Sequence, residues 1–466
     1  MKEENEFFFG EDPTMEIVQK YEDMLRYNRS FFFDVADFEN IIDFYLSSDN
    51  SMRASEAIDI AYSMHPYSTE IQFRKAEALF YDNKHAEALE ILNVLEKIES
   101  DNSEILFLKG KLHLEQRELK IAHSSFWRAA HGYNEDKIDL LLRIASLYQD
   151  YNELNYALRY LLLAYKIEKN NLNILFELGY TFERLGDMSQ SEKFYNLYLD
   201  TNPFSSSVWY NLGIVYTRMG KFARALDAYE YALAVEPANS SAIHNKANTL
   251  ATIEKYDEAV EAFVELLEFE PDNKRIYASL GECYEKLDDY PRAMEYFNKA
   301  LEIDASMSDA FYGIGVVNLK LDKLDLALMN IEKAIALNPE NYDYWLGLAK
   351  VKFELGHDDE AENAYMEATM LNPEEPEAYI GLAELKLFKE SYPQVEELYN
   401  EVNDKFNDIS ALKIIYASAL YLQGKSKLAL DMLREAKSQN PFTVEDFLAV
   451  VSVISDEGFL QELKQI

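Results

Sequence analysis

The chain has 466 residues, of which 48% are hydrophobic, and only 15 Gly and 11 Pro. This length exceeds one ordinary compact domain, and so little Gly and Pro argues against long linkers or a turn-rich β fold, so several domains or one elongated array, mostly helical, are expected. Asp and Glu outnumber Lys and Arg by 84 to 45, and the resulting net charge of −39 repels phosphate backbones and anionic membrane surfaces. We therefore expect neither nucleic acid nor a membrane as the partner.

The first residues, MKEENEFFFGEDP, are acidic where a secretory signal would be basic, and Phe7–Phe9 is too short an apolar run for the core of such a signal. No run of eighteen apolar residues occurs, so no membrane-spanning helix is expected. The one cysteine, Cys283, excludes an intramolecular disulfide and fits a reducing compartment. These features predict a cytoplasmic protein.

Residues 1–34 are expected to form an N-terminal segment with a capping helix. Asp12 and Pro13 have the pattern of a helix cap and first turn. The apolar face that follows consists of Ile17, Tyr21, Met24 and Leu25. Phe31–Phe33 are expected in the core of this cap. Phe7–Phe9 fit either a short docking motif or a segment that packs on the following array.

Residues 35–443 contain a pattern that repeats every 34 residues. The nine later repeats begin at residues 138, 172, 206, 240, 274, 308, 342, 376 and 410. One extra residue, Lys137, shifts the frame, and the three earlier repeats begin at 35, 69 and 103. The sequence therefore predicts twelve tandem repeats.

The repeat at 206–239 shows the pattern most fully. Its signature residues are Trp209, Leu212, Gly213, Tyr216, Ala225, Tyr229 and Pro237. The eighth residue is Gly or Ala in nearly every repeat and the twentieth is usually Ala, which lets two helices approach closely. This spacing resembles the tetratricopeptide repeat family. The resemblance covers nearly nine-tenths of the chain and implies an all-α, right-handed superhelix of antiparallel helix pairs, with the first helix of each pair on the concave face.

The turn between the two helices of each repeat is expected at the fifteenth residue. This position holds residues that tolerate the left-handed conformation, among them Gly186, Gly220, Gly356, Gly424, Asn83, Asn152, Asp49, Asp288 and Asp322. Proline follows at the thirty-second position in seven repeats, including Pro203 and Pro339, and is expected to stop the second helix.

Residues 444–466 are expected to form C-terminal capping helices. Thr443 and Asp446 have the pattern of a helix cap before the apolar residues that begin with Phe447. Gly458 is expected to interrupt the chain before a last short helix that ends at Ile466.

No pattern in the chain indicates catalysis. The seven histidines are scattered, and neither an HExxH pair, a Cys-x-x-Cys pair, a phosphate-binding glycine loop nor a G-x-S-x-G elbow occurs. His123 and His131 lie eight residues apart without a third ligand nearby. We therefore expect no enzyme activity, no cofactor and no metal.

Recognition residues are expected in the groove. By the family resemblance, the second, fifth, sixth, ninth, twelfth and thirteenth residues of each repeat face it, and across the repeats from 138 to 308 they mix aromatic, amide and charged side chains. Arg143 and Glu282 belong to this surface. The candidate partner-binding residues are Phe176, Tyr180, Arg184, Tyr210, Asn211, Arg218, His244, Asn245, Asn248, Arg275, Lys286, Tyr312 and Lys320.

Three sets among these residues have alternative interpretations. The amides of Asn211, Asn245 and Asn248 could hold an extended peptide backbone. The cations at the thirteenth position either complement the dipole of their helix or form a positive stripe for a carboxylate or acidic segment. The aromatic residues at the fifth and ninth positions either contact a partner or pack on the next repeat.

The sequence thus predicts a protein-interaction scaffold or adaptor that binds a protein or extended peptide in its concave groove. The alternative is a non-catalytic regulatory subunit of a multiprotein enzyme complex. The sequence identifies neither the partner nor the oligomeric state.

Overall fold

The computed structural model describes residues 13–132, 136–403, 405–406, 409–451 and 457–466. The chain divides into two compact bodies, the N-terminal body (Met1–Gly220) and the C-terminal body (Lys221–Ile466). The division falls between the two helices of the repeat predicted at 206–239. Asp12 and Phe7–Phe9 lie outside the described residues.

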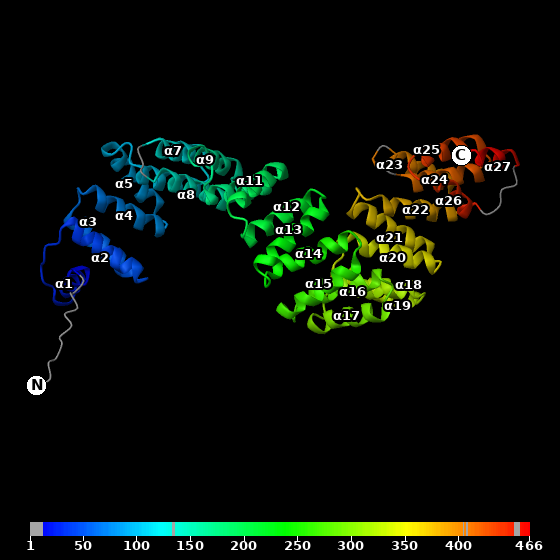
Figure 1. Cartoon of the computed structure of the whole chain (residues 1–466), viewed down its shortest axis with the longest axis horizontal. Coiled ribbons are helices and arrows are strands. Elements are labelled where there is room, and N and C mark those ends of the chain that lie inside the picture. Colours follow the sequence, from blue (N-terminus) through cyan, green and yellow to red (C-terminus); the bar gives the residue numbers. More distant parts are fainter. Residues whose placement is uncertain (1–12, 133–135, 404, 407–408, 452–456) are drawn as a thin grey trace, which may run out of the picture. The chain divides into compact units, whose positions relative to one another are not determined.

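The N-terminal body contains α1 (Pro13–Tyr27), α2 (Val35–Ser47), α3 (Ser51–Met64), α4 (Thr69–Tyr81), α5 (His85–Ile98), α6 (Ser103–Glu115), α7 (Leu119–His131), α8 (Lys137–Asp150), α9 (Leu154–Ile167), α10 (Leu172–Arg184), α11 (Met188–Thr201) and α12 (Ser206–Arg218). Consecutive helices within this body pack against each other (Figure 1).

The C-terminal body contains α13 (Phe222–Val235), α14 (Ser240–Thr252), α15 (Tyr256–Phe269), α16 (Lys274–Lys286), α17 (Tyr290–Ile303), α18 (Ser308–Lys320), α19 (Leu324–Leu337), α20 (Tyr342–Glu354), α21 (Asp358–Leu371), α22 (Pro376–Phe388), α23 (Tyr392–Val402), α24 (Ser410–Leu422), α25 (Ser426–Lys437), α26 (Thr443–Val450) and α27 (Glu457–Leu463).

The chain is all-α, built from tandem antiparallel helix pairs, and the described residues include no strand. The even-numbered helices from α2 to α24 begin at the first residues of the twelve predicted repeats, except that α8 begins one residue early, at Lys137. The extra residue therefore lengthens α8 to 14 residues, where α6 and α10 have 13. None of the described helices combines the length and the apolar character that crossing a bilayer requires.

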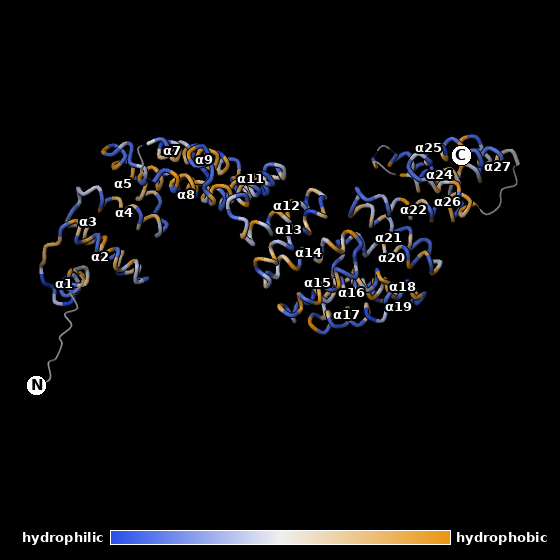
Figure 2. The backbone as a smooth tube through the Cα atoms, in the orientation of Figure 1, coloured by the Kyte–Doolittle hydropathy of each residue, from blue (hydrophilic) through white to orange (hydrophobic). Residues whose placement is uncertain are grey.

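Small residues bring the two helices of a pair together, as the sequence predicts. Polar and apolar residues alternate along the helices (Figure 2), and the apolar ones form the core between neighbouring helices. A Cβ atom on Gly179 would lie 2.5 Å from the Tyr195 ring, and one on Gly110 would lie 2.6 Å from the Phe126 ring. These glycines leave room for a ring of the second helix, which a larger residue would displace.

Asparagine caps the first helix of many repeats. This feature was not predicted from the sequence. The last residue of the preceding repeat supplies the side chain that accepts a hydrogen bond from the helix N-terminus. These caps are Asn102, Asn171, Asn239, Asn273 and Asn341. The cap of α10 also donates a hydrogen bond from Asn171 Nδ2 to Glu168 at 2.9 Å.

The turn inside each pair uses the left-handed conformation at the fifteenth position of all twelve repeats. Nine of these residues were expected from their type, from Gly186 (φ +83°) to Asp49 (φ +55°). The other three are residue types that pay a steric cost for a positive φ: Arg117 (φ +61°), Glu254 (φ +62°) and Glu390 (φ +52°).

Replacing Glu254 with glycine is therefore expected to raise the free energy of unfolding by about 1 kcal/mol, because the left-handed backbone no longer strains a side chain. The reverse change, Gly356→Glu, is expected to lower it by a similar amount, since a Cβ atom at Gly356 would meet nothing within 4 Å and only the backbone conformation (φ +73°) opposes it. Urea unfolding midpoints check both variants. Changes of the same sign would contradict this explanation.

The N-terminal cap largely follows the prediction. Tyr21 is fully buried, and Ile17, Met24 and Leu25 pack on the same core as Phe33. Phe31 packs at the edge of this core, but Phe32 is 72% exposed and lies edge-to-face with the His65 ring. The triplet is therefore core at its two ends and exposed at its centre.

The predicted details of the C-terminal cap are wrong in two places. Helix α26 begins at Thr443 itself, so its N-cap is Phe442, whose side chain has no acceptor to offer, and the Thr443 hydroxyl donates to the Asn440 carbonyl at 2.6 Å. Asp446 accepts a hydrogen bond from Asn440 Nδ2 at 2.7 Å instead of capping the helix. Gly458 lies inside α27 and does not precede it.

Candidate partner-binding groove

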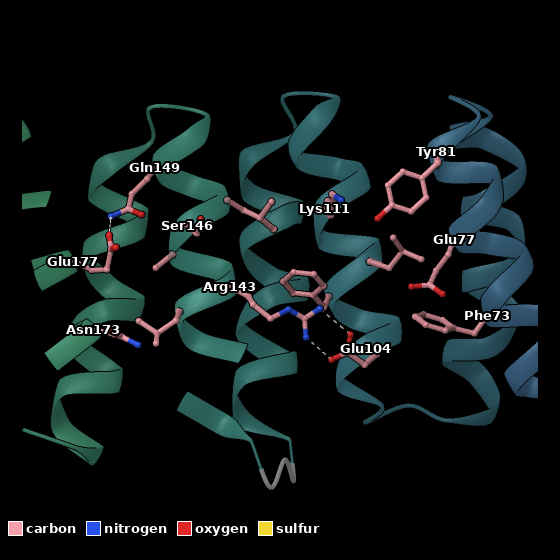
Figure 3. A pocket seen from close by; sticks show the side chains of 15 residues that line it. Phe73, Glu77, Tyr81, Glu104, Lys111, Arg143, Ser146, Gln149, Asn173 and Glu177 are labelled. Atoms are coloured by element: carbon pink, nitrogen blue, oxygen red, sulfur yellow. Dashed lines mark hydrogen bonds and ion pairs between the residues drawn. The ribbon is translucent and has the colours of Figure 1, made fainter. Parts of the chain in front are cut away.

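The N-terminal body has a cavity of about 550 Å³ along its first helices, which we call the N-groove. Figure 3 shows the labelled side chains of four neighbouring helices projecting into it. Its lining consists of Phe73, Glu77, Tyr81, Glu104, Phe107, Leu108, Lys111, Leu142, Arg143, Ala145, Ser146, Leu147, Gln149, Asn173 and Glu177. They belong to α4, α6, α8 and α10.

Nearly all of these residues stand at the repeat positions expected to face the groove. Phe73 and Phe107 are fifth residues, Lys111 and Ser146 are ninth residues, and Arg143 is a sixth residue. Of the lining residues, only Arg143 was expected on this surface from the sequence. The others, in the repeats at 69 and 103 and also in those at 138 and 172, were not among the predicted residues, although the same positional rule applied to all four repeats would have identified most of them.

Arg143 lies at the centre of the N-groove, fixed between two neighbours. Its Nη1 and Nη2 atoms bond the two carboxylate oxygens of Glu104 at 2.9 and 3.1 Å, as the dashed lines in Figure 3 mark. Its guanidinium lies 4.2 Å from the centre of the Phe107 ring. The bond to Glu104 raises the pKa of Arg143. The guanidinium is therefore a held cation, still about two-fifths exposed to a ligand (41%).

The floor on either side of Arg143 offers further polar groups. Gln149 Nε2 donates to Glu177 at 2.8 Å and to the Thr181 hydroxyl at 2.9 Å. Lys111 Nζ lies 4.3 Å from the Phe80 ring. Ser146 is exposed. The groove thus offers both hydrogen-bond donors and acceptors on either side of Arg143.

A second cavity of about 410 Å³ continues the N-groove across α2, α3 and α4. The two cavities share Glu77 and Tyr81 in their linings. Burial raises the pKa of the Glu77 carboxyl group. The Arg74 guanidinium, 3.6 Å from that carboxylate, opposes this rise. The two adjoining cavities therefore extend from α2 to α10.

The candidate residues of the N-terminal body are not among the residues that line the N-groove. Phe176 is half-buried, with its ring centre 6.2 Å from that of Tyr195 in its own helix pair. Tyr180 is 37% exposed, and the Arg184 guanidinium lies 5.7 Å from its ring. Tyr210 is half-buried on α12.

Two further candidates take part in contacts of the scaffold. Asn211 is half-buried and lies near the buried Tyr195 side chain, where it opposes the rise that burial causes in the pKa of Tyr195. Arg218 Nη1 lies 3.3 Å from Glu183, whose side chain is only 10% exposed. Burial raises the pKa of Glu183, and Arg218 opposes that shift.

A cavity of about 350 Å³ in the C-terminal body brings two candidates together, Lys286 and Tyr312. Tyr312 packs on the next pair, with its ring centre 4.9 Å from that of Tyr344, which is the packing alternative that the sequence left open. Acidic side chains dominate the rest of the lining: Glu282, Glu285, Asp309 and Asp343. Loss of hydration, reinforced by Asp309 and Glu285, raises the pKa of Glu282 to about 7.

The remaining candidates of the C-terminal body lie apart from this cavity. Asn248 Nδ2 is 3.3 Å from His244 Nε2, so these two form a pair on α14. Asn245 is half-buried on the same helix, and Arg275 is exposed at the start of α16.

The cations at the thirteenth position are ion-paired or hydrogen-bonded to the preceding repeat or to their own helix. Lys320 Nζ lies 2.7 Å from the buried carboxylate of Glu285, and Lys286 lies 3.5 Å from the same group. Arg184 donates to Asn152 at 2.7 Å, and Arg218 pairs with Glu183. This is a third role, a link between successive repeats, which neither alternative from the sequence included.

No three His, Cys, Asp or Glu side chains converge as metal ligands within the part of the chain that the structure describes. His123 instead receives a hydrogen-bonding contact from the Tyr160 hydroxyl at 2.8 Å, and burial lowers its pKa. The ring centre of His131 lies 4.0 Å from that of Trp127, which is also 5.9 Å from the ring centre of His123. The two histidines therefore pack on either side of one tryptophan as parts of the scaffold.

Solved structures that resemble the chain cover parts of it. A tetratricopeptide repeat protein from Parabacteroides merdae has 18% identity and a TM-score of 0.42, over 63% of this chain and 97% of that one. A MamA protein has 23% identity and a TM-score of 0.35, over 36% and 92%. YrrB, described as a TPR protein with an unusual peptide-binding site, has 21% identity and a TM-score of 0.34, over 38% and 92%.

Sequence comparisons identify the repeat directly. A TPR repeat-containing protein of Methanocaldococcus jannaschii is 33% identical over 133 residues, which are 28% of this chain and 23% of that protein, so the match spans about a quarter of the relative's length. Family models described as tetratricopeptide repeat match residues 172–204, 206–239, 244–310 and 318–385. With the 34-residue helix pairs described above, these matches show that the chain belongs to the tetratricopeptide repeat family.

Proposed function

We propose that the chain is a cytoplasmic, non-catalytic scaffold or adaptor, and that its N-groove binds an extended segment of a partner protein. The observation that carries this proposal is the N-groove itself, a hollow lined by equivalent positions of four successive repeats. A surface that recurs from helix to helix can contact a chain that crosses the helices one after another.

The dimensions suit a short peptide. Neighbouring packed helices lie about 10 Å apart, so four first helices span about 30 Å. An extended chain rises about 3.3 Å per residue and would place about nine residues across them. The adjoining cavity at α2–α4 lengthens this track.

The side chains supply what an extended segment needs. The half-buried Phe73 offers apolar surface, while Asn173 and Ser146 offer polar groups to a peptide backbone. Arg143, held by Glu104, costs little further ordering when it meets a carbonyl or carboxylate. The groove carries both positive and negative side chains. A bound segment would therefore meet a basic group at Arg143 and acidic groups at Glu77 and Glu177.

Filling the N-groove tests the proposal. Peptides of twelve random residues would be selected on the full-length chain, and their affinities measured by fluorescence anisotropy. The variant Ser146→Arg places a long side chain in the hollow, and its matched control, Ser124→Arg, places the same exposed residue on α7 outside it. We expect Ser146→Arg to weaken the selected peptides at least about tenfold and Ser124→Arg to leave them unchanged.

Peptides that bind Ser146→Arg as tightly as the original chain would contradict binding in the N-groove. Crosslinking of a bound peptide that carries a photoreactive residue then shows where it lies. Crosslinks on α4, α6, α8 or α10 support the proposal, and crosslinks confined to other helices contradict it.

A further inference from the structure

The C-terminal body has a second hollow, on the side formed by its second helices. This cavity of about 390 Å³, which we call the outer cleft, runs between α21 and α23, with α22 as its floor. It is lined by Glu362, Met366, Thr369, Met370, Tyr379, Leu382, Lys386, Gln394, Glu397, Leu398 and Glu401. No residue of the N-groove or of the other candidate surfaces belongs to it.

The floor and one wall of the outer cleft are apolar. Tyr379 and Leu382 of α22 form the floor, each with less than a tenth of its surface exposed. Met366 and Met370 of α21 stand one turn apart on the wall, 47% and 65% exposed. Thioether side chains are flexible and polarizable, so they adapt to apolar partners of irregular shape. Two exposed methionines beside an apolar floor therefore form an apolar surface that a partner could bury.

The opposite wall is acidic. Gln394, Glu397 and Glu401 of α23 follow one face of that helix, at spacings of three and four residues, and all three are exposed. Within the described residues, neither Glu397 nor Glu401 has a cation within ion-pair distance. Glu362, in contrast, is occupied by Lys386 and by Lys389 at 3.1 Å. The free charge of the cleft is therefore negative and lies on one wall only.

We propose that the outer cleft binds an amphipathic basic helix of a partner protein. Its apolar stripe would rest on Tyr379, Leu382 and the two methionines, and Lys or Arg residues along one flank would meet Glu397 and Glu401. The acidic wall from Gln394 to Glu401 is about 10 Å long at about 1.5 Å per residue, which matches two turns of a helix with anchors at i, i+3 or i+4, and i+7. A net charge of −39 also draws a basic partner toward the chain.

The probe is a fluorescein-labelled 18-residue peptide of Leu, Ala and Lys, with leucines on one helical stripe and lysines on the adjacent flank. A second peptide has the same composition with the leucines scattered. Anisotropy titrations of the full-length chain at about 0.15 M salt, where surface charges are screened beyond about 8 Å, compare the two. We expect the striped peptide to bind at least about tenfold more tightly, because only it presents a continuous apolar face.

Variants with matched controls locate the site. Glu397→Lys/Glu401→Lys is expected to weaken the striped peptide about tenfold, whereas Glu265→Lys/Glu268→Lys makes the same charge change on α15 and should have little effect. Met366→Ser/Met370→Ser is expected to weaken it as well, and Met329→Ser, at a methionine 57% exposed on α19, is its control. Circular dichroism checks that each variant remains helical.

Three results would overturn the proposal. The scattered peptide could bind as well as the striped one, which would reduce the interaction to net charge. Glu397→Lys/Glu401→Lys and Glu265→Lys/Glu268→Lys could weaken binding equally, which would again reduce the interaction to net charge. Sedimentation could show the chain to be a dimer that Met366→Ser/Met370→Ser dissociates, which would make a second copy the occupant of the cleft.

Discussion

Replacing Gly313 with alanine is expected to lower the free energy of unfolding of the C-terminal body by about 3 kcal/mol, the cost of overpacking a filled core. The fully buried Phe297 ring lies between two glycines. A Cβ atom on Gly313 would overlap the outer end of the ring, and one on Gly281 would lie 2.7 Å from its Cδ1 and Cε1 atoms. The ring is therefore already in close contact with the backbones of both α16 and α18, and it has little room to move away from an added methyl group. Urea unfolding of the variant measures the loss.

A graded pair of controls tests this cause. Gly347→Ala would bring a Cβ atom to 2.8 Å from the Tyr312 ring, but Tyr312 is only half-buried and can move, so a smaller loss is expected. The substitution Phe297→Leu removes the far part of the ring. In a chain that carries it, Gly313→Ala should lower the free energy of unfolding less than it does in the original chain. If the two losses simply add, the overlap with Phe297 is not the cause.

Most of what the sequence predicted correctly about the fold came from the 34-residue repeat period. Residues of one type at one position, such as the buried Ala225 and Ala293, have the same neighbours in every helix pair, so their role follows from their recurrence. The turn position shows the limit of this reasoning. Arg117, Glu254 and Glu390 are left-handed because the helix pairs on either side impose the turn, and their residue types give no sign of it.

The candidate site was less predictable for a different reason. The family positions that face the groove do line the N-groove, but where it deepens depends on side-chain size and pairing between repeats. Arg143, for example, is held in place by its hydrogen bonds to Glu104, which lies 39 residues away in the chain. Tyr312, the fifth residue of its repeat, packs beside Gly347 of the next repeat and also lines the cavity of the C-terminal body. Sequence position alone therefore does not show how much of such a side chain is used in packing between repeats.

The thirteenth-position cations lead to the second large effect. Lys320→Met is expected to lower the free energy of unfolding by about 2 kcal/mol, because it leaves the carboxylate of Glu285 buried without its nearest cation. The Glu285 side chain is 7% exposed, with Lys320 at 2.7 Å and Lys286 at 3.5 Å. The remaining lysine compensates in part, so the loss should fall below that of a buried charge with no partner. Unfolding in urea measures it.

The matched control is Lys299→Met, which removes a lysine from a pair with Glu295, where both side chains are largely exposed (41% and 58%). An exposed pair of this kind contributes little, so a loss of about 0.5 kcal/mol or less is expected. Combining Lys320→Met with Glu285→Met should recover most of the stability, since no buried charge then remains. Equal losses for the two single variants would instead mean that Lys320 does not stabilise the array and that its charge is free for a ligand, as the positive-stripe interpretation requires.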